Sequence, residues 1–252
     1  MGELELDGEK HFTGILHDLS RRTELEDRLR EATAMARLGE MAAVIAHEVK
    51  NPLAAVRGAI QVLGTRLPPA ASDAAIVKEI IARLDALNDL IQDLLVFARP
   101  PAPKRAKTDL AALMLAVASL LKTDPAFGAL HIELTGSAPP LDADGNLLTI
   151  VFQNLLINSA QAVQGRGRID VTFGADGGWH QVEVVDNGPG IPREIQESLF
   201  RPFKTTKARG TGLGLAISRR IVEAHGGAIS VSNGHGQGLT LQIIIPKGSS
   251  GV

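Results

Sequence analysis

The sequence predicts an α+β protein in two parts, and three observations lead to this expectation. Apolar residues recur every three or four positions between about residues 25 and 63 and again between 72 and 94, which is typical of two long amphipathic helices. A proline-rich segment, residues 100–105, then ends the helical pattern. Beyond it, short strands alternate with helices, which favours helices packed on one face of a mostly antiparallel or mixed sheet.

The composition narrows the class of protein. A hydrophobic content of 44% and a charged content of 21% are those of a globular chain, and the net charge of −2 gives no electrostatic footprint for nucleic acid or an anionic membrane. No run of about 18 apolar residues is present and the N-terminus lacks a signal-peptide pattern, so we expect a cytoplasmic chain without a membrane segment. The absence of cysteine excludes disulfides and thiolate chemistry.

The first residues predict two short strands, 3–6 and 12–16, joined by a polar turn at 7–10. Two strands alone are marginal in water, so we expect them to be the end of a larger sheet that lies outside this sequence. Ser20 is then a candidate cap for the first long helix.

The two long helices predict an antiparallel hairpin. The first runs to about Leu63, residues 64–71 form a turn, and Ser72 or Asp73 caps the second. One hairpin buries only one side of each helix, so dimerisation into a four-helix bundle is the expected completion.

The second part has a simple predicted order. We expect helices at 109–121, 146–163 and 213–224, and strands at 131–135, 168–173, 180–185, 228–232 and 239–245. A hairpin turn is expected at 175–178, where Asp176 precedes two glycines.

His47 lies nearly opposite the apolar stripe of the first helix, at about 100° per residue. Its face continues through Asn51, Ala54 and Gly58, which are small and uncharged, and we interpret this face as a docking surface. The alternative is an ordinary exposed histidine with Asn51 as a hydrogen-bond partner, beside a proline, Pro52, that normally kinks or ends a helix.

Three clusters in the second part carry candidate chemistry. Asn154 and Asn158 share one helical face, where neutral carboxamides suit Mg²⁺ held between phosphates; a merely polar helix face is the alternative. Asp186 follows an apolar strand and precedes Gly188 and Gly190, which suits an acceptor for an exocyclic amino group; a tight turn is the alternative.

The third cluster is a glycine loop, residues 210–214, that leads into a helix and offers backbone N–H groups to an anion. It also fits a dinucleotide fingerprint, but neither a βαβ unit nor a Walker lysine surrounds it. Upstream, Phe200 and Phe203 are expected to anchor a basic segment, residues 201–209, that can close over a polyphosphate as a short lid.

The order and spacing of these motifs resemble the sensor histidine kinases of two-component signalling, over about residues 25–246. His47-Glu48 with Asn51-Pro52-Leu53 match the H box of that family, and residues 154–162 match the N box. The G1, F and G2 boxes are matched by 186–190, by Phe200 and Phe203, and by 210–214. The H box and the Thr-Thr-Lys lid are most similar to the nitrogen-regulation subgroup, which is coupled to PAS sensors.

The resemblance implies a fold and a division into domains. Residues 1–24 are similar to the end of a PAS-like sensor, whose remainder would lie upstream and outside this sequence. Residues 25–99 would be the dimerising phosphoacceptor hairpin, 100–108 a linker, and 109–247 an α/β-sandwich ATP-binding domain of the GHKL (Bergerat) type.

The resemblance also implies a reaction. ATP would bind with its adenine on Asp186 and Mg²⁺ on Asn158, and His47 would accept the γ-phosphoryl group with Glu48 as proton acceptor. The phosphoryl group would pass to an aspartate of a response regulator, and Asn51 would help a phosphatase reaction. The nucleotide-binding residues implied are Asn154, Asn158, Asp186, Gly188, Gly190, Phe200, Phe203, Lys204, Lys207, Gly210, Thr211, Gly212, Leu213 and Gly214.

Two other readings stay open from the sequence. The nucleotide domain is similar to GHKL ATPases and serine kinases, which would not need His47 or its helix. A catalytically silent dimeric scaffold is the other alternative.

Overall fold

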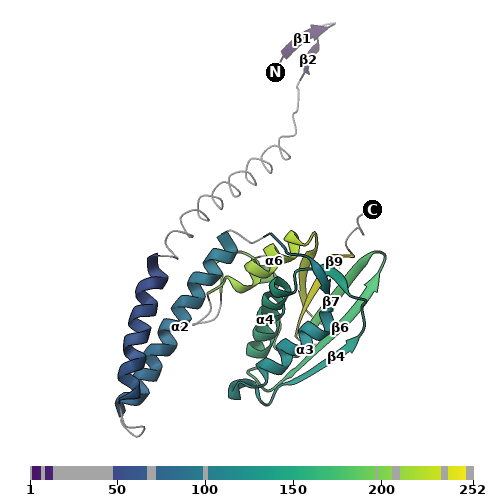
Figure 1. Ribbon diagram of the computed structural model, residues 1–252. Coiled ribbons are helices and arrows are strands. Elements are labelled where there is room, and N and C mark those ends of the chain that lie inside the picture. The colour runs from purple at the N-terminus through teal and green to yellow at the C-terminus, as the bar shows by residue number, and fades with distance from the viewer. Residues whose placement is uncertain are drawn as a thin grey trace.

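The computed structural model describes residues 2–6, 9–13, 48–66, 72–98, 102–196, 198–205, 211–233 and 238–247. Figure 1 shows a helical hairpin beside an α/β domain, with a small β-hairpin near the N-terminus. Of the residues expected in functional roles, His47, Lys207 and Gly210 lie outside the described ranges.

The N-terminal hairpin has a shorter turn and an earlier second strand than predicted. Strands β1 (Gly2–Leu6) and β2 (Glu9–Thr13) pair antiparallel, with Leu6 opposite Glu9. The predicted second strand, 12–16, was therefore placed three residues too late. The expectation of a four-residue polar turn was wrong because Glu9 and Lys10 already pair with β1, so only two residues join the strands.

The helical hairpin is formed by residues 48–65 and by α2 (Ser72–Ala98), which lie side by side in Figure 1. The first helix runs through Pro52, as the apolar stripe required. Arg57 Nε lies 2.6 Å from Asp85 Oδ1, which joins the two helices across the hairpin. Near the turn, a Cβ on Gly64 would lie 2.8 Å from Val77 Cγ1, so the helices approach closely there.

The second domain contains a five-stranded sheet in the order β4-β6-β7-β9-β8. Its β4–β6 pair is parallel and the other pairs are antiparallel, so the mixed sheet is confirmed. The strands are β4 (His131–Gly136), β6 (Arg168–Asp176), β7 (Trp179–Asp186), β8 (Ala228–Asn233) and β9 (Leu239–Pro246).

Three helices cover one face of this sheet: α3 (Leu110–Leu121), α4 (Gly145–Ala162) and α6 (Gly214–Ala224). All three are within two residues of their predicted bounds. Between these helices and the sheet lies one core, whose fully buried members include Phe152, Leu148 and Ile217. This two-layer packing holds α4 and the start of α6 at fixed positions, and both elements carry candidate site residues.

Asp144 ties the linker to this core. Its Oδ1 accepts the N–H groups of Asn146 and Leu147 at the start of α4, and its Oδ2 accepts the N–H of Lys104 at 2.8 Å. Burial opposes ionisation of Asp144, but these three N–H groups and His225 outweigh it and lower the pKa of the carboxyl. The end of the linker is therefore fixed to the N-terminus of α4.

Four short elements were not predicted: β3 (Ala106–Thr108), β5 (Leu141–Ala143), the 3₁₀ helix η1 (Pro125–Phe127) and α5 (Arg193–Gln196). With three or four residues each, they are too short to show a hydrophobic period. Within the described part of the chain, we find no helix with the length and apolar character needed to cross a membrane.

Candidate functional site

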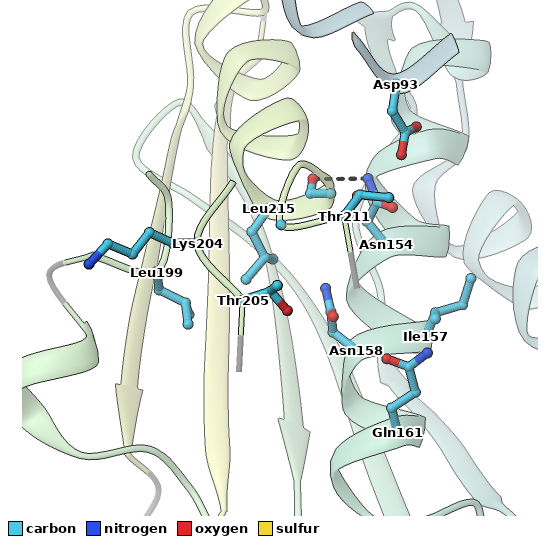
Figure 2. Close-up of a pocket in the computed structure, with 12 residues that line it drawn as sticks. Asp93, Asn154, Ile157, Asn158, Gln161, Leu199, Lys204, Thr205, Thr211 and Leu215 are labelled. Atoms are coloured by element: carbon cyan, nitrogen blue, oxygen red, sulfur yellow. Dashed lines mark hydrogen bonds between the residues drawn. The ribbon is translucent and has the colours of Figure 1, made fainter. Parts of the chain in front are cut away.

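A pocket of about 210 Å³ opens between α4, the loop that precedes α6, residues 199–205 and the second hairpin helix, α2 (Figure 2). It unites six residues predicted from three separate motifs with residues to which the sequence analysis gave no role. Its lining consists of Asp93, Asn154, Ile157, Asn158, Gln161, Leu199, Lys204, Thr205, Thr211, Gly212, Gly214 and Leu215.

Asn154 holds the glycine loop in place. Its side-chain Nδ2 donates to the carbonyl oxygen of Gly214 at 3.0 Å and to Ser218 Oγ at 3.3 Å, both on α6. A Cβ on Gly214 would lie 3.1 Å from Asn154 Oδ1, so the loop approaches α4 closely. These bonds indicate that Asn154 positions the loop.

Asn158 lies one turn further along α4 on the wall of the pocket, half-buried. Its carboxamide oxygen is a suitable ligand for Mg²⁺, which prefers oxygen donors and retains several waters or phosphate oxygens. Among the described residues, no group of three or more His, Asp or Glu side chains could hold a metal ion. An ion here would therefore depend on oxygens that a ligand supplies.

Gly212 permits the lid segment to pack on the glycine loop. Its φ is +68°, and a Cβ would lie 2.7 Å from the carbonyl carbon of Phe203 and 2.8 Å from Lys204 N. Phe203 N donates to the Gly212 carbonyl oxygen at 3.1 Å, and Thr211 Oγ1 accepts the N–H of Leu213 at 3.2 Å. The loop is thus held in place by its own hydrogen bonds and by α4.

The structure corrects the anchor role expected of Phe203 and describes the surroundings of Leu213 and Lys204. Phe203 is not an anchor: its φ of +60° turns the chain toward Gly212, and its side chain is 60% exposed. Leu213 is buried in the core, so it fixes the start of α6 and its side chain is unavailable to a nucleotide. Lys204 lines the pocket, but its ammonium points away from Asn154 and Asn158 in Figure 2.

Phe200 does act as the predicted anchor. It is half-buried and packs against the core. The guanidinium carbon of Arg219, on α6, lies 6.0 Å from the centre of its ring, within the range of a cation–π contact. The start of the lid is therefore attached to the same helix that follows the glycine loop.

Asp186 ends β7 with one carboxylate oxygen free. The residue is 2% exposed, and its Oδ1 accepts the N–H groups of Gly188 at 2.9 Å and Leu239 at 3.2 Å. Its Oδ2 is buried and has no hydrogen-bond partner among the residues that the structure describes. A buried carboxylate oxygen that lacks a donor is costly, and an exocyclic amino group would satisfy it.

The turn after Asp186 needs its glycines. A Cβ on Gly188 would lie 2.9 Å from Asp186 Oδ1, and Gly190 has a φ of +68° with Asn233 Oδ1 close by. Asn233, which the sequence did not indicate, holds the turn: its Oδ1 accepts the N–H of Ile191 at 3.0 Å and its Nδ2 donates to the Ile191 carbonyl at 2.8 Å.

A second cavity of about 380 Å³ adjoins the first. Leu199, Lys204 and Thr205 belong to both linings, and Gly190 lines the second cavity only. Asp186 and Gly188 line neither of the two, so the structure brings the phosphate-binding candidates together without opening them onto Asp186.

The helix that follows His47 stands apart from the pocket. Glu48 and Asn51 are exposed, and no described residue of 48–65 belongs to the pocket lining. The face predicted around His47 is open as far as it is described, since a Cβ on Gly58 would meet no atom within 4 Å.

The matches to family models cover both parts of the chain. Residues 37–103 match the His Kinase A (phospho-acceptor) domain, and residues 143–249 match the histidine kinase-, DNA gyrase B-, and HSP90-like ATPase family. The catalytic domain of histidine kinase ThkA is 31% identical, with 57% of this chain and 96% of that one covered and a TM-score of 0.53. The chain belongs to the sensor histidine kinases.

Longer relatives extend the likeness over both domains of this histidine kinase. The signal transduction histidine-protein kinase AtoS of Escherichia coli K12 is 38% identical over 240 residues, which are 94% of this chain and 39% of AtoS. Full-length ShkA in complex with AMPPNP has a TM-score of 0.73 at 28% identity, over 84% of this chain and 47% of that one.

A complex of ThkA with the response regulator protein TrrA matches with a TM-score of 0.63 at 27% identity, over 90% of this chain and 66% of ThkA's. This histidine kinase spans 39% of the length of AtoS. The matches confirm the predicted family and the order of its two domains.

Proposed function

We propose that this chain binds Mg-ATP in its second domain, phosphorylates itself on His47 and transfers the phosphoryl group to an aspartate of a response regulator. The free, buried Oδ2 of Asp186 is the observation that carries the proposal, because it requires a donor that the described protein does not supply. The amino group of adenine is such a donor.

The phosphates then extend toward the pocket formed by Asn158, Thr211 and Gly212. Backbone N–H groups at the start of α6 and the positive end of its dipole favour an anion there. Asn158 holds Mg²⁺ together with phosphate oxygens. Lys204 reaches the phosphates after a change of rotamer, and Lys207 belongs to the same basic segment.

The reaction at His47 is an in-line displacement. One neutral imidazole nitrogen attacks the γ-phosphorus, a P–N bond forms, and the bond from phosphorus to the bridging oxygen breaks to release ADP. Glu48, next in sequence and exposed, accepts the proton from the other ring nitrogen. A receiver aspartate then takes the phosphoryl group from the imidazole, and Asn51 orients a water that later hydrolyses the aspartyl phosphate.

The domain division supports this cycle. Residues 25–99 carry the acceptor and 109–247 the nucleotide, so the domains must move relative to each other for His47 to meet the γ-phosphate. Lys104 and β3 are fixed to the nucleotide domain, so we assign this motion to the part of the linker, 100–108, that precedes Lys104. The relative ThkA is described in complex with a response regulator, which supports a receiver domain as partner. Residues 1–24 fit the end of an upstream PAS-like sensor, and we place the chain in the cytoplasm.

Homodimerisation completes the proposal. Within residues 48–66 and 72–98, the large apolar side chains that are exposed are Val56, Val62, Leu63, Ile76, Ile80, Leu87 and Leu90. A patch of this kind marks a contact surface, and a second copy of the same hairpin presents a matching one.

Labelling with γ-³²P ATP and Mg²⁺ tests the acceptor. Wild type and the control His131→Gln, an exposed histidine on β4, should acquire label that is lost in acid and stable in base. His47→Gln should acquire none while it still binds ATP. Label that persists in His47→Gln would refute the assignment, and phosphate release without labelled protein would favour a GHKL ATPase.

Calorimetry with Asn158→Ala tests the metal role. Affinity for ATP should fall at least tenfold in Mg²⁺ and change little in EDTA, because only the metal-dependent part is lost. Equal losses with and without Mg²⁺ would contradict the role given to Asn158.

Asn51→Ala should retain phosphorylation of His47 and slow dephosphorylation of the receiver.

A further inference from the structure

The last turns of α2 are fastened to the nucleotide domain. Arg220, on α6, donates to the carbonyl oxygen of Phe97, and its guanidinium carbon lies 5.3 Å from the centre of the Phe97 ring. Ile91, Phe97 and Ala98 are buried, and Phe97 belongs to the same core cluster as α4 and α6. The end of the hairpin therefore has a defined docking position on the nucleotide domain.

This contact brings one carboxylate of the hairpin to the nucleotide pocket. Asp93 is four residues before Phe97, so both side chains lie on the same face of α2. Asp93 lines the pocket together with Asn154, Thr211 and Gly214. In Figure 2 its carboxylate points toward Thr211 and Asn154, the part of the pocket that we assign to the phosphates.

The negative charge of Asp93 is not compensated by the residues that the structure describes. Neither a hydrogen bond nor an ion pair to this carboxylate occurs within those ranges. Burial, and to a lesser extent the neighbouring Asp89, raise the pKa of Asp93. Lys204 is the one positively charged residue in the described lining, and its ammonium points away.

We propose that Asp93 weakens the binding of a nucleoside triphosphate by electrostatic repulsion. When α2 is docked through Phe97 and Arg220, the Asp93 carboxylate repels the terminal phosphate, and we call this effect the gate. This inference rests on the proposed binding of ATP in the pocket. Because coupling between two binding events is reciprocal, ATP in turn weakens the docking of α2 and releases the nucleotide domain. A nucleoside diphosphate, with less charge at that end, disturbs the docked arrangement less.

Calorimetry on the whole chain with Mg²⁺ and three ligands tests the gate. Asp93→Asn should bind ATP about three- to tenfold more tightly than wild type, ADP with a smaller gain, and adenosine equally. The gain should shrink between 50 mM and 500 mM salt, since screening weakens a repulsion between charges. Asp89→Asn is the matched control, because it removes the same charge one turn away outside the pocket, and should change each affinity less than twofold.

The variant Arg220→Gln distinguishes repulsion that depends on the docking of α2 from a direct role of Asp93 as a ligand. If docking places Asp93 in the pocket, Arg220→Gln should also tighten ATP binding, and Asp93→Asn should add no further gain to it. Additive gains, equal gains for adenosine, or an unchanged ATP affinity in Asp93→Asn would overturn the proposal. Weaker ATP binding in Asp93→Asn would also overturn it and indicate a carboxylate that helps to hold Mg²⁺.

Failure of the gate can be distinguished from failure of the proposed function. Binding of ATP and labelling of His47 by wild type report on the proposed function. The ratio of ATP to adenosine affinity, compared between wild type and Asp93→Asn, reports on the gate alone.

Discussion

The hairpin and the nucleotide domain bury their apolar side chains to very different extents. In the nucleotide domain, helices and sheet enclose one core, in which Leu148 and Phe152 are fully buried. In the hairpin, the apolar stripe is largely open, and Leu63 remains 57% exposed. The difference indicates that the nucleotide domain is complete within one chain, whereas the hairpin needs another surface.

The largest expected effect tests this contrast with one substitution in each region. Leu148→Ala should lower the free energy of unfolding of the nucleotide domain by about 3 kcal/mol, because it leaves a cavity in a closed core. Leu63→Ala should change that free energy by less than about 0.5 kcal/mol. Urea unfolding followed by the fluorescence of Trp179, on β7 of that domain, measures both.

Comparable losses from the two substitutions would show that hairpin and nucleotide domain unfold as one unit. In that case the described contacts between α2 and α6 would be strong enough to join them.

The second effect concerns the open stripe itself. Ile76→Ser should weaken self-association about tenfold or more, because it removes an apolar side chain from the proposed dimer surface. Sedimentation equilibrium measures the dissociation constant. Lys78→Ser, on the same turn of α2, is the control and should leave association within about twofold of wild type. An unchanged dimer in Ile76→Ser would remove the hairpin stripe from the interface.

A third effect concerns Asp144, where the linker meets the nucleotide domain. Asp144→Asn keeps a cap for α4 but turns the acceptor for Lys104 N into a donor, at a cost of about 1–3 kcal/mol at pH 7. The folded pKa of Asp144 is lowered, so its ionised form stabilises the fold above its ordinary pKa of 3.8. This contribution is lost as the pH falls through the lowered folded pKa.

The difference between wild type and Asp144→Asn should therefore be constant above about pH 5 and shrink below the ordinary value. Thermal unfolding between pH 2.5 and 7 measures it. Asp109→Asn is the control, because Asp109 caps α3 and accepts only the N–H groups of Ala111 and Ala112. A gap that widens in acid would contradict the sign.

The smallest effect compares two glycines of one helix. Gly58→Ala should stabilise the hairpin by up to about 1 kcal/mol, since alanine favours a helix and its Cβ meets nothing within 4 Å. Gly64→Ala should give less or be unfavourable, because its Cβ would lie 2.8 Å from Val77 Cγ1. Circular dichroism during thermal unfolding distinguishes them. A destabilising Gly58→Ala would indicate that the open face packs against a second chain in the dimer.

Local patterns predicted most of the fold. The bounds of α3, α4 and α6 follow from apolar periods, which act within a few positions of the chain. Wrong or missing predictions were those without a local period, such as β3 and β5, which form only because they pair with each other across the fold.

The sequence predicted which residues belong to the candidate site better than it predicted what each of them does there. The spacing of Asn154 and Asn158 placed both on one face, but only the packing of α4 against α6 shows that the Asn154 amide is engaged by Gly214 and Ser218. Likewise, the sequence predicted the same anchoring role for Phe200 and Phe203, but the turn at Gly212 leaves Phe203 exposed.

By itself, the sequence determined the family, the two-part architecture and the motif residues, because each rests on short-range spacing that any fold of this chain must respect. The tertiary structure alone decided that Asp186 keeps a buried oxygen free, that Asn233 holds the turn beside it, and that Asp93 reaches the pocket. These depend on contacts between residues far apart in the chain, whose geometry is fixed only when the helices and the sheet pack together.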